Sequence, residues 1–315
     1  MRAHGDPDPY QGDEEEGDDV TLDGSTYQWP GEEPLRLRTS KQVHFDPLNL
    51  PLLAALPRAI RPMDAVLYHG CGIGLLGLLA LRAGAGRVHF ADVLPGAVDL
   101  AASNARNAGF RQGEQWTAAL ADLRARAGSG GASVGAARGA AADGAGGGGG
   151  VAAAQYDLIL CNPPQLAGPA AMAAARPDRY AGPRGTDYYE ALAALAASAL
   201  RRGGRVALMQ TSLSSFSAVD ALFVAHGLAP TTLASQPRAA AAAAFEALAP
   251  GTLAWLLALR ARGAADFRLV DASGSALPAA PAPHGDGPGR ACTLEPTQAE
   301  TQATVQFSQR LVVFE

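Results

Sequence analysis

Apolar residues follow two rhythms along this chain. Short apolar runs bounded by Gly, Pro or acidic residues predict buried strands. Longer stretches with apolar residues on one face predict helices packed on a sheet. The predicted strands cover residues 35–38, 65–68, 87–91, 115–121, 156–161, 205–209, 229–236, 252–260 and 310–314, and the predicted helices cover residues 75–82, 95–108, 190–200 and 214–226, after an apolar helical run that ends at residue 56.

Strands and helices alternate between residues 65 and 122. This order predicts parallel strands joined by crossover helices. Gly84 and Gly86 follow the first of these helices, and Pro95 stands in the first turn of the second, where proline is well tolerated. The predicted fold class is therefore α/β, a single domain built on a doubly wound, Rossmann-like sheet.

Composition divides the chain into segments. Residues 1–34 hold eleven Asp or Glu and one Arg, a net charge of −10, and are expected to form a disordered acidic tail. The remaining residues carry a mild excess of +5, which permits an anionic partner without arguing for one. Residues 127–154 are almost entirely Ala and Gly and are expected to be a flexible insert. The predicted domain thus spans residues 35–262, and residues 263–315 form a low-complexity extension with a final edge strand.

Several classes of protein are excluded by what the chain contains. Its cysteines, Cys71, Cys161 and Cys292, have no motif spacing, so neither a disulfide framework nor a metal site is expected. The acidic N-terminus lacks the apolar core of a signal peptide, and no apolar run is long enough to span a bilayer. We expect a cytoplasmic protein that does not contact membranes.

A glycine-rich turn follows the strand at residues 65–68. The sequence His69-Gly70-Cys71-Gly72-Ile73-Gly74 has the spacing Gly-x-Gly-x-Gly, and glycines let the backbone turn tightly and approach a ligand closely. The amino end of the next helix then faces that ligand. Asp92 ends the second strand of the alternation and suits hydrogen bonds to both hydroxyls of a ribose. The candidate cofactor-binding residues are therefore Gly70, Cys71, Gly72, Gly74 and Asp92.

The ligand of this turn is either a dinucleotide or an S-adenosyl group. The last glycine comes one residue earlier than in the dinucleotide pattern, and this favours the S-adenosyl group. Asp122, after the third strand, is a candidate contact for an adenine amino group, and its alternative interpretation is a solvated loop acid.

A stiff polar loop follows the buried strand at residues 156–161. Prolines cannot continue a central strand, so the chain must turn within Asn162-Pro163-Pro164-Gln165. Ligands of open α/β sheets bind at the carboxyl ends of the strands. An amide held there could accept hydrogens from a planar amino group. Asn162, Pro163, Pro164 and Gln165 are therefore the candidate catalytic residues, and Asn162 is also a candidate cofactor contact.

Taken together, these motifs resemble those of class I S-adenosylmethionine-dependent methyltransferases over residues 43–260. The combination is the glycine turn, Asp92, and the run Asp157-Leu158-Ile159-Leu160-Cys161-Asn162-Pro163-Pro164, in that order. The last motif is similar to that of the amino-methylating branch, which includes release-factor glutamine methyltransferases of the HemK type and enzymes that methylate RNA or DNA bases. The resemblance implies S-adenosyl-L-methionine as cofactor and a seven-stranded sheet of order 3-2-1-4-5-7-6, with strand 7 antiparallel.

Two positions depart from the family pattern. Tyr68 stands where the family usually has an acid that helps to hold the cofactor, and Gln165 stands where it usually has an aromatic residue that stacks on the acceptor. Stacking is open instead to Tyr180, Tyr188 or Tyr189, each of which is alternatively a packing residue.

The resemblance implies N-methylation, and the acceptor we expect first is a protein side chain such as a glutamine-like amide. A nucleic-acid base is the second candidate, with Arg176, Arg179, Arg184, Arg201 and Arg202 as a route for an anionic partner. A small molecule is the third. The histidines are interpreted as structural, since the transfer requires alignment more than acid–base catalysis. A methyltransferase-like protein that binds without transferring remains an alternative, as does, more remotely, a nucleotide-sugar or NAD enzyme.

Overall fold

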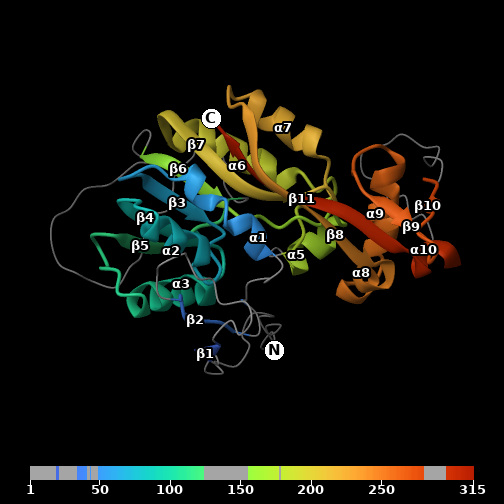
Figure 1. Cartoon of the computed structure of the whole chain (residues 1–315), viewed down its shortest axis with the longest axis horizontal. Coiled ribbons are helices and arrows are strands. Elements are labelled where there is room, and N and C mark those ends of the chain that lie inside the picture. Colours follow the sequence, from blue (N-terminus) through green and yellow to red (C-terminus); the bar gives the residue numbers. More distant parts are fainter. Residues whose placement is uncertain are drawn as a thin grey trace, which may run out of the picture.

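A computed structural model describes the central part of the protein and its C-terminal strand (Figure 1). The expected acidic tail, except for residues 19–20 and 34, lies outside the described residues, as do the Ala/Gly insert and Cys292. No described helix is long and apolar enough to cross a membrane. The described residues are 19–20, 34–40, 43, 49–123, 155–176, 179–279 and 296–315.

The centre of the molecule is a mixed sheet. Its main run has the order β5-β4-β3-β6-β7-β11-β8, in which the first five strands are parallel and β11 is antiparallel to both of its neighbours. This is the predicted 3-2-1-4-5-7-6 order with strand 7 antiparallel, so the predicted α/β fold class is confirmed. The strands are β3 (Ala65–His69), β4 (Arg87–Asp92), β5 (Trp116–Leu120), β6 (Tyr156–Cys161), β7 (Leu200–Thr211), β8 (Pro230–Ala241) and β11 (Thr304–Phe314).

Helices cover both faces of this sheet (Figure 1). One face packs against α1 (Leu50–Leu53), the 3-10 turn at Leu56–Ala59, α2 (Leu75–Arg82) and α3 (Pro95–Asn107). The other packs against α6 (Asp187–Ala199) and α7 (Phe216–Val224). The predicted helices at 75–82, 95–108, 190–200 and 214–226 are all present, and each lies in the layer that a doubly wound sheet requires. A short helix, α5 (Ala170–Ala175), lies in the connection between β6 and α6.

A third apolar cluster extends the molecule beyond the sheet predicted from the sequence. It is built by α8 (Ala242–Leu248), α9 (Thr252–Ala261), β9 (Arg268–Val270) and the first half of β11. β9 pairs with residues 304–306 of β11, β10 (Ala276–Leu277) pairs with β9, and α10 (Gln298–Gln302) precedes β11. In Figure 1 these elements form the lobe that is joined to the central sheet through β8 and β11.

Two predictions about the C-terminal third are wrong. Residues 252–260 form helix α9, because Leu253, Leu256 and Leu257 recur on one buried face, as a helix requires. Residues 310–314 are not an edge strand, because β11 lies between β7 and β8. Its apolar residues are buried on both faces of the sheet, which is characteristic of a central strand. The predicted strand at 35–38 is reduced to β2 (Leu37–Arg38), which pairs with β1 (Asp19–Val20).

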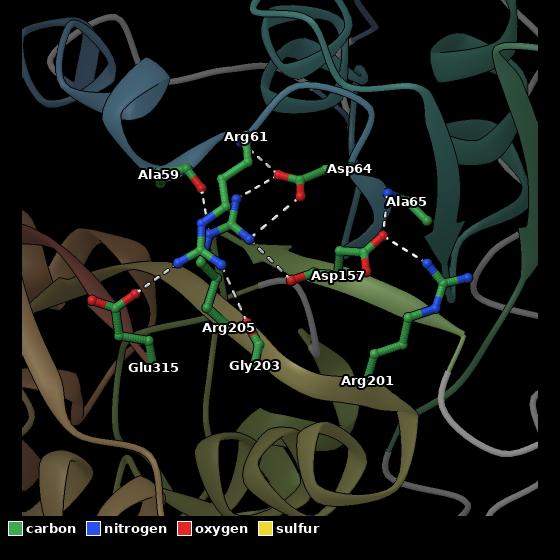
Figure 2. Close-up of polar contacts among 9 residues, drawn as sticks. All are labelled: Ala59, Arg61, Asp64, Ala65, Asp157, Arg201, Gly203, Arg205 and Glu315. Atoms are coloured by element: carbon green, nitrogen blue, oxygen red, sulfur yellow. Dashed lines mark hydrogen bonds and ion pairs between the residues drawn. The ribbon is translucent and has the colours of Figure 1, made fainter.

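Near the amino ends of β3, β6 and β7, buried charges tie the sheet to the chain that enters it (Figure 2). Arg205 forms an ion pair with Asp64 and donates to the carbonyl oxygens of Ala59 at 2.8 Å and Asp157 at 3.2 Å. Asp64 also accepts a hydrogen bond from the backbone N–H of Arg61, at 2.7 Å. Since the donors and acceptors of this network are matched to one another, we interpret it as structural.

Candidate active site

The glycine turn forms at the carboxyl end of β3. Gly70, Gly72 and Gly74 all have positive φ, at 68°, 51° and 86°, a region that other residues rarely adopt. The backbone N–H groups of Gly70 and Cys71 both donate to the carbonyl oxygen of Ala91, at 2.8 and 3.1 Å, and so fasten the turn to β4. Among the described residues, a Cβ on Gly72 would meet only Val43 Cγ1, at an ordinary contact distance of 3.8 Å.

Asp92, the last residue of β4, lies beside this turn. Its carboxylate is buried; Oδ2 accepts the N–H of Gly72 and Oδ1 accepts that of Leu94, each at 3.0 Å. These two backbone hydrogen bonds hold the carboxylate of Asp92 against the glycine turn. Cys71 is fully buried, and burial raises the pKa of its thiol well above the usual value, so Cys71 fills space beneath the turn.

Asn104 on α3 is a supporting residue that the sequence analysis missed. Its Nδ2 donates to the carbonyl oxygens of Ile73 at 2.9 Å and Arg38 at 3.0 Å, and its Oδ1 accepts the N–H of Arg38 at 2.7 Å. Asn104 is fully buried and thus holds the glycine turn and β2 together. The available signal was a polar residue on the apolar face of a predicted helix.

The Asn162 loop comes to the same edge of the sheet. Cys161, the last residue of β6, is paired in register with His69, the last residue of the parallel strand β3, so the two loops start side by side. Asn162 is half-buried and Pro163 is buried. Gln165 Nε2 donates to Asn162 Oδ1 at 3.1 Å, so the carboxamides of the two residues face each other.

Three contacts hold this loop in place. Leu166 and Tyr180 form a short parallel bridge, with the Leu166 N–H donating to Arg179 O at 3.0 Å and the Ala181 N–H donating to Leu166 O at 2.7 Å. Ser214 Oγ lies 3.2 Å from the carbonyl oxygen of Gln165. The position of Asn162 is therefore set by one segment that precedes β7 in the chain and by one residue, Ser214, that follows it.

The three tyrosines proposed for stacking are all buried. Tyr180 bonds to Thr252 Oγ1 at 2.8 Å in the third cluster, and Tyr189 packs in the core under α6, where burial raises the pKa of its hydroxyl. Tyr188 Oη lies 2.7 Å from His69 Nδ1 and accepts from Cys161 Sγ at 3.6 Å. Tyr188 therefore joins the ends of β3 and β6 beneath the two loops, and none of the three rings is placed as an exposed stacking platform.

Asp122, the candidate contact for the adenine amino group, follows β5. The register of β4 with β5 pairs Asp92 with Leu120, which brings the exposed Asp122 to the same edge as the glycine turn.

The arginines proposed to contact an anionic partner include two that form ion pairs. Arg184 pairs with Asp187 and Glu190 of α6, and Arg201 pairs with Asp157 near the amino ends of the strands. Two of the five arginines named for an anionic partner therefore pair with separate acids at opposite ends of the strands, and the anionic partner stays a prediction. No group of three or more metal-ligating side chains occurs within the described ranges.

The fold and the site together define a doubly wound α/β protein with a glycine turn, a buried acid and a carboxamide loop on adjacent strands. No family model matches the chain. A stretch of 55 residues is 44% identical to ribosomal protein L11 methyltransferase of Nitrosomonas europaea, and the match spans 18% of this chain and 18% of that relative.

Among solved structures, the ribosomal protein L11 methylase of Lactobacillus delbrueckii subsp. bulgaricus aligns with 67% of this chain and 83% of its own, at 17% identity and a TM-score of 0.43. A TehB-like SAM-dependent methyltransferase of Corynebacterium glutamicum aligns with 57% of this chain and 73% of its own, at 16% identity and a TM-score of 0.34.

Proposed function

We propose that this protein is an S-adenosyl-L-methionine-dependent methyltransferase that N-methylates a protein side chain, with the Asn-Pro-Pro loop as its acceptor site. The observation that carries the proposal is the convergence of the glycine turn, Asp92 and Asn162 at the ends of three adjacent parallel strands. The 55-residue match to a curated methyltransferase supports the same reaction class.

The residues present fit the cofactor. Gly72 carries no side chain where the ligand would approach the turn, and the carboxylate of Asp92 beside it would accept hydrogen bonds from the ribose hydroxyls. Asp122, which follows the next strand at the same edge, would meet the adenine amino group, and the register of β4 with β5 supports this role. Tyr68, in place of the usual acid, is buried with its ring 6.4 Å from that of Phe90 and thus belongs to the core. Cofactor affinity consequently depends on Asp92.

When bound, S-adenosylmethionine supplies an electrophilic methyl group: its sulfur keeps the electron pair of the broken S–C bond, and the acceptor nitrogen forms the C–N bond and releases one proton to water. Asn162 Oδ1 and the carbonyl oxygen of Pro163 accept hydrogen bonds from that nitrogen and so direct its lone pair. Pro163 and Pro164 hold these acceptors still. Such alignment lowers the barrier without a strong base.

A protein side chain is the acceptor we favour over a nucleic-acid base. The described loop carries no exposed aromatic ring on which a base would stack, and Arg184 and Arg201 are each paired with an acid. A non-catalytic binding protein is the competing interpretation, and the buried Tyr68 is the observation in its favour.

Transfer of a labelled methyl group tests the proposal. The protein is incubated with S-adenosylmethionine carrying a labelled methyl group and with cell extract, and the label is then sought separately in protein, RNA and small molecules. We expect label in protein that is released by acid hydrolysis as an N-methylated residue. Cofactor binding by calorimetry without transfer to any fraction would favour the non-catalytic interpretation.

A further inference from the structure

Gln165 shares the acceptor site with Asn162. Its Nε2 donates to Asn162 Oδ1 at 3.1 Å, so this bond fixes which side of the Asn162 carboxamide presents its oxygen. A carbonyl oxygen accepts two hydrogen bonds. Asn162 Oδ1 therefore keeps one direction for a further donor, close to the Gln165 carboxamide.

The other end of the Gln165 side chain has no matching donor. Oε1 is buried, and none of the described residues donates a hydrogen bond to it. A buried carbonyl oxygen without a donor is costly, and only an N–H or O–H group can satisfy it. Gln165 thus differs from the Arg205–Asp64 network at the amino ends of the strands, in which each charged group has a partner.

The main chain at Gln165 is held in place. Ser214 Oγ contacts its carbonyl oxygen at 3.2 Å, and the next residue, Leu166, is bridged to Tyr180. Ser214 is itself fully buried and also lies 3.1 Å from the carbonyl oxygen of Gly185. The side chain of Gln165 is consequently presented beside Asn162 from a fixed backbone.

We propose that Gln165 is a specificity-determining residue: Gln165 Oε1 takes the place given above to the Pro163 carbonyl oxygen, so that Gln165 Oε1 and Asn162 Oδ1 together accept the two N–H groups of one acceptor nitrogen. This inference rests on the proposed function and narrows its substrate class to a primary amide or primary amine, held by hydrogen bonds instead of aromatic stacking. A monomethylated amide keeps one N–H and satisfies only one of the two oxygens. The product of the wild-type protein is accordingly monomethylated.

Binding of small amides tests the pairing. Propionamide, N-methylpropionamide and N,N-dimethylpropionamide are titrated by NMR into protein saturated with S-adenosylhomocysteine. The wild type is expected to prefer propionamide over its N-methyl derivative by about tenfold, because one oxygen loses its donor. Gln165→Met, which has a similar volume and no carbonyl group, should reduce that preference to about twofold or less. The matched control is Gln236→Met, which should keep the preference. Gln236 is a half-buried glutamine on β8 whose Nε2 donates to Gln309 on β11.

Two results would overturn the pairing of Gln165 Oε1 with Asn162 Oδ1. Equal discrimination by the wild type and Gln165→Met overturns the pairing while leaving methyl transfer intact. A Gln165 side-chain amide resonance that does not move when propionamide binds the wild type overturns it as well, without any variant. Failure of the proposed function looks different: the wild type then binds neither S-adenosylhomocysteine nor the amides, and both proposals fall.

Discussion

The two edges of the central sheet use opposite chemistry. Near the amino ends of the strands, Arg205 and Asp64 are buried as an ion pair, and Arg205 donates further hydrogen bonds to the backbone (Figure 2). At the carboxyl ends the same strands finish in glycines and a carboxamide loop. The buried acid there, Asp92, receives backbone N–H groups.

We assign the groups at the amino ends of the strands to fold stability and those at the carboxyl ends to ligand binding. In a charge network whose members are already paired, no charged group is available to bind a ligand. Removing one member leaves its partner's charge buried without a counter-ion. At the carboxyl ends, in contrast, Gln165 Oε1 receives no hydrogen bond from the described residues, and a Cβ at Gly72 would meet only Val43 Cγ1 among them. Changes at the two edges should therefore be distinguishable by what they alter.

The largest expected effect is at the amino edge. Arg205→Met leaves Asp64 buried without its cation and should lower the free energy of unfolding by about 3–5 kcal/mol. Urea denaturation measures the loss. The double variant Arg205→Met/Asp64→Leu should recover most of it, because it removes the stranded carboxylate too. If the double variant is no more stable than the single one, the ion pair is not the dominant interaction at this edge.

The next effect tests the glycine turn. Gly72→Ala and Gly113→Ala both place a side chain at positive φ, and neither Cβ would clash with the described protein, so each should cost about 1–2 kcal/mol of stability. Only Gly72→Ala places that side chain in the glycine turn, and its affinity for S-adenosylmethionine should fall about tenfold or more. Calorimetry compares the two variants. Equal affinities would place the cofactor elsewhere.

The smallest effect is a pH dependence at the amino edge. Burial raises the pKa of Asp157, but the N–H of Ala65 at 2.9 Å and the Arg201 guanidinium outweigh it, so the pKa of Asp157 lies below its usual value. Its contribution to stability is therefore present above about pH 4 and is lost as pH falls through the lowered pKa. The difference in urea midpoint between the wild type and Asp157→Asn should shrink between about pH 6 and pH 3. A constant difference over this range would assign no role to the charge.

The alternating half of the fold was predictable from the sequence, and the C-terminal third was not. Strands β3 and β4 are short apolar runs closed by Gly or Asp, and local pattern suffices to find them. The apolar run that forms α9 fits a helix or a strand equally well by hydrophobicity alone. The partner of Arg310 in β7, Gln210, lies 100 residues away, and no local pattern reveals such a pairing.

The site shows the same division. The glycine turn, Asp92 and Asn162 could be found because each motif is contiguous and the parallel sheet brings strand ends together. Asn104 was visible only as a polar residue on an apolar helix face, and its contact could not be predicted, because it joins Asn104 to Arg38, 66 residues away in the chain. The bond between Gln165 and Asn162 was hidden for another reason: the sequence shows that an aromatic residue is replaced, but not where the replacing carboxamide points.

The acceptor role of Asn162 is tested most directly by comparing the rates of methyl transfer of Asn162→Ala and Asn107→Ala. Asn107 is an exposed asparagine at the end of α3. Both variants are assayed with labelled S-adenosylmethionine on the protein fraction that the wild type labels, and cofactor affinity is measured alongside by calorimetry. We predict that Asn162→Ala binds the cofactor like the wild type and transfers about a hundredfold more slowly or less, while Asn107→Ala is unchanged. Transfer by Asn162→Ala at the wild-type rate would contradict the assignment of the carboxyl edge as the acceptor site.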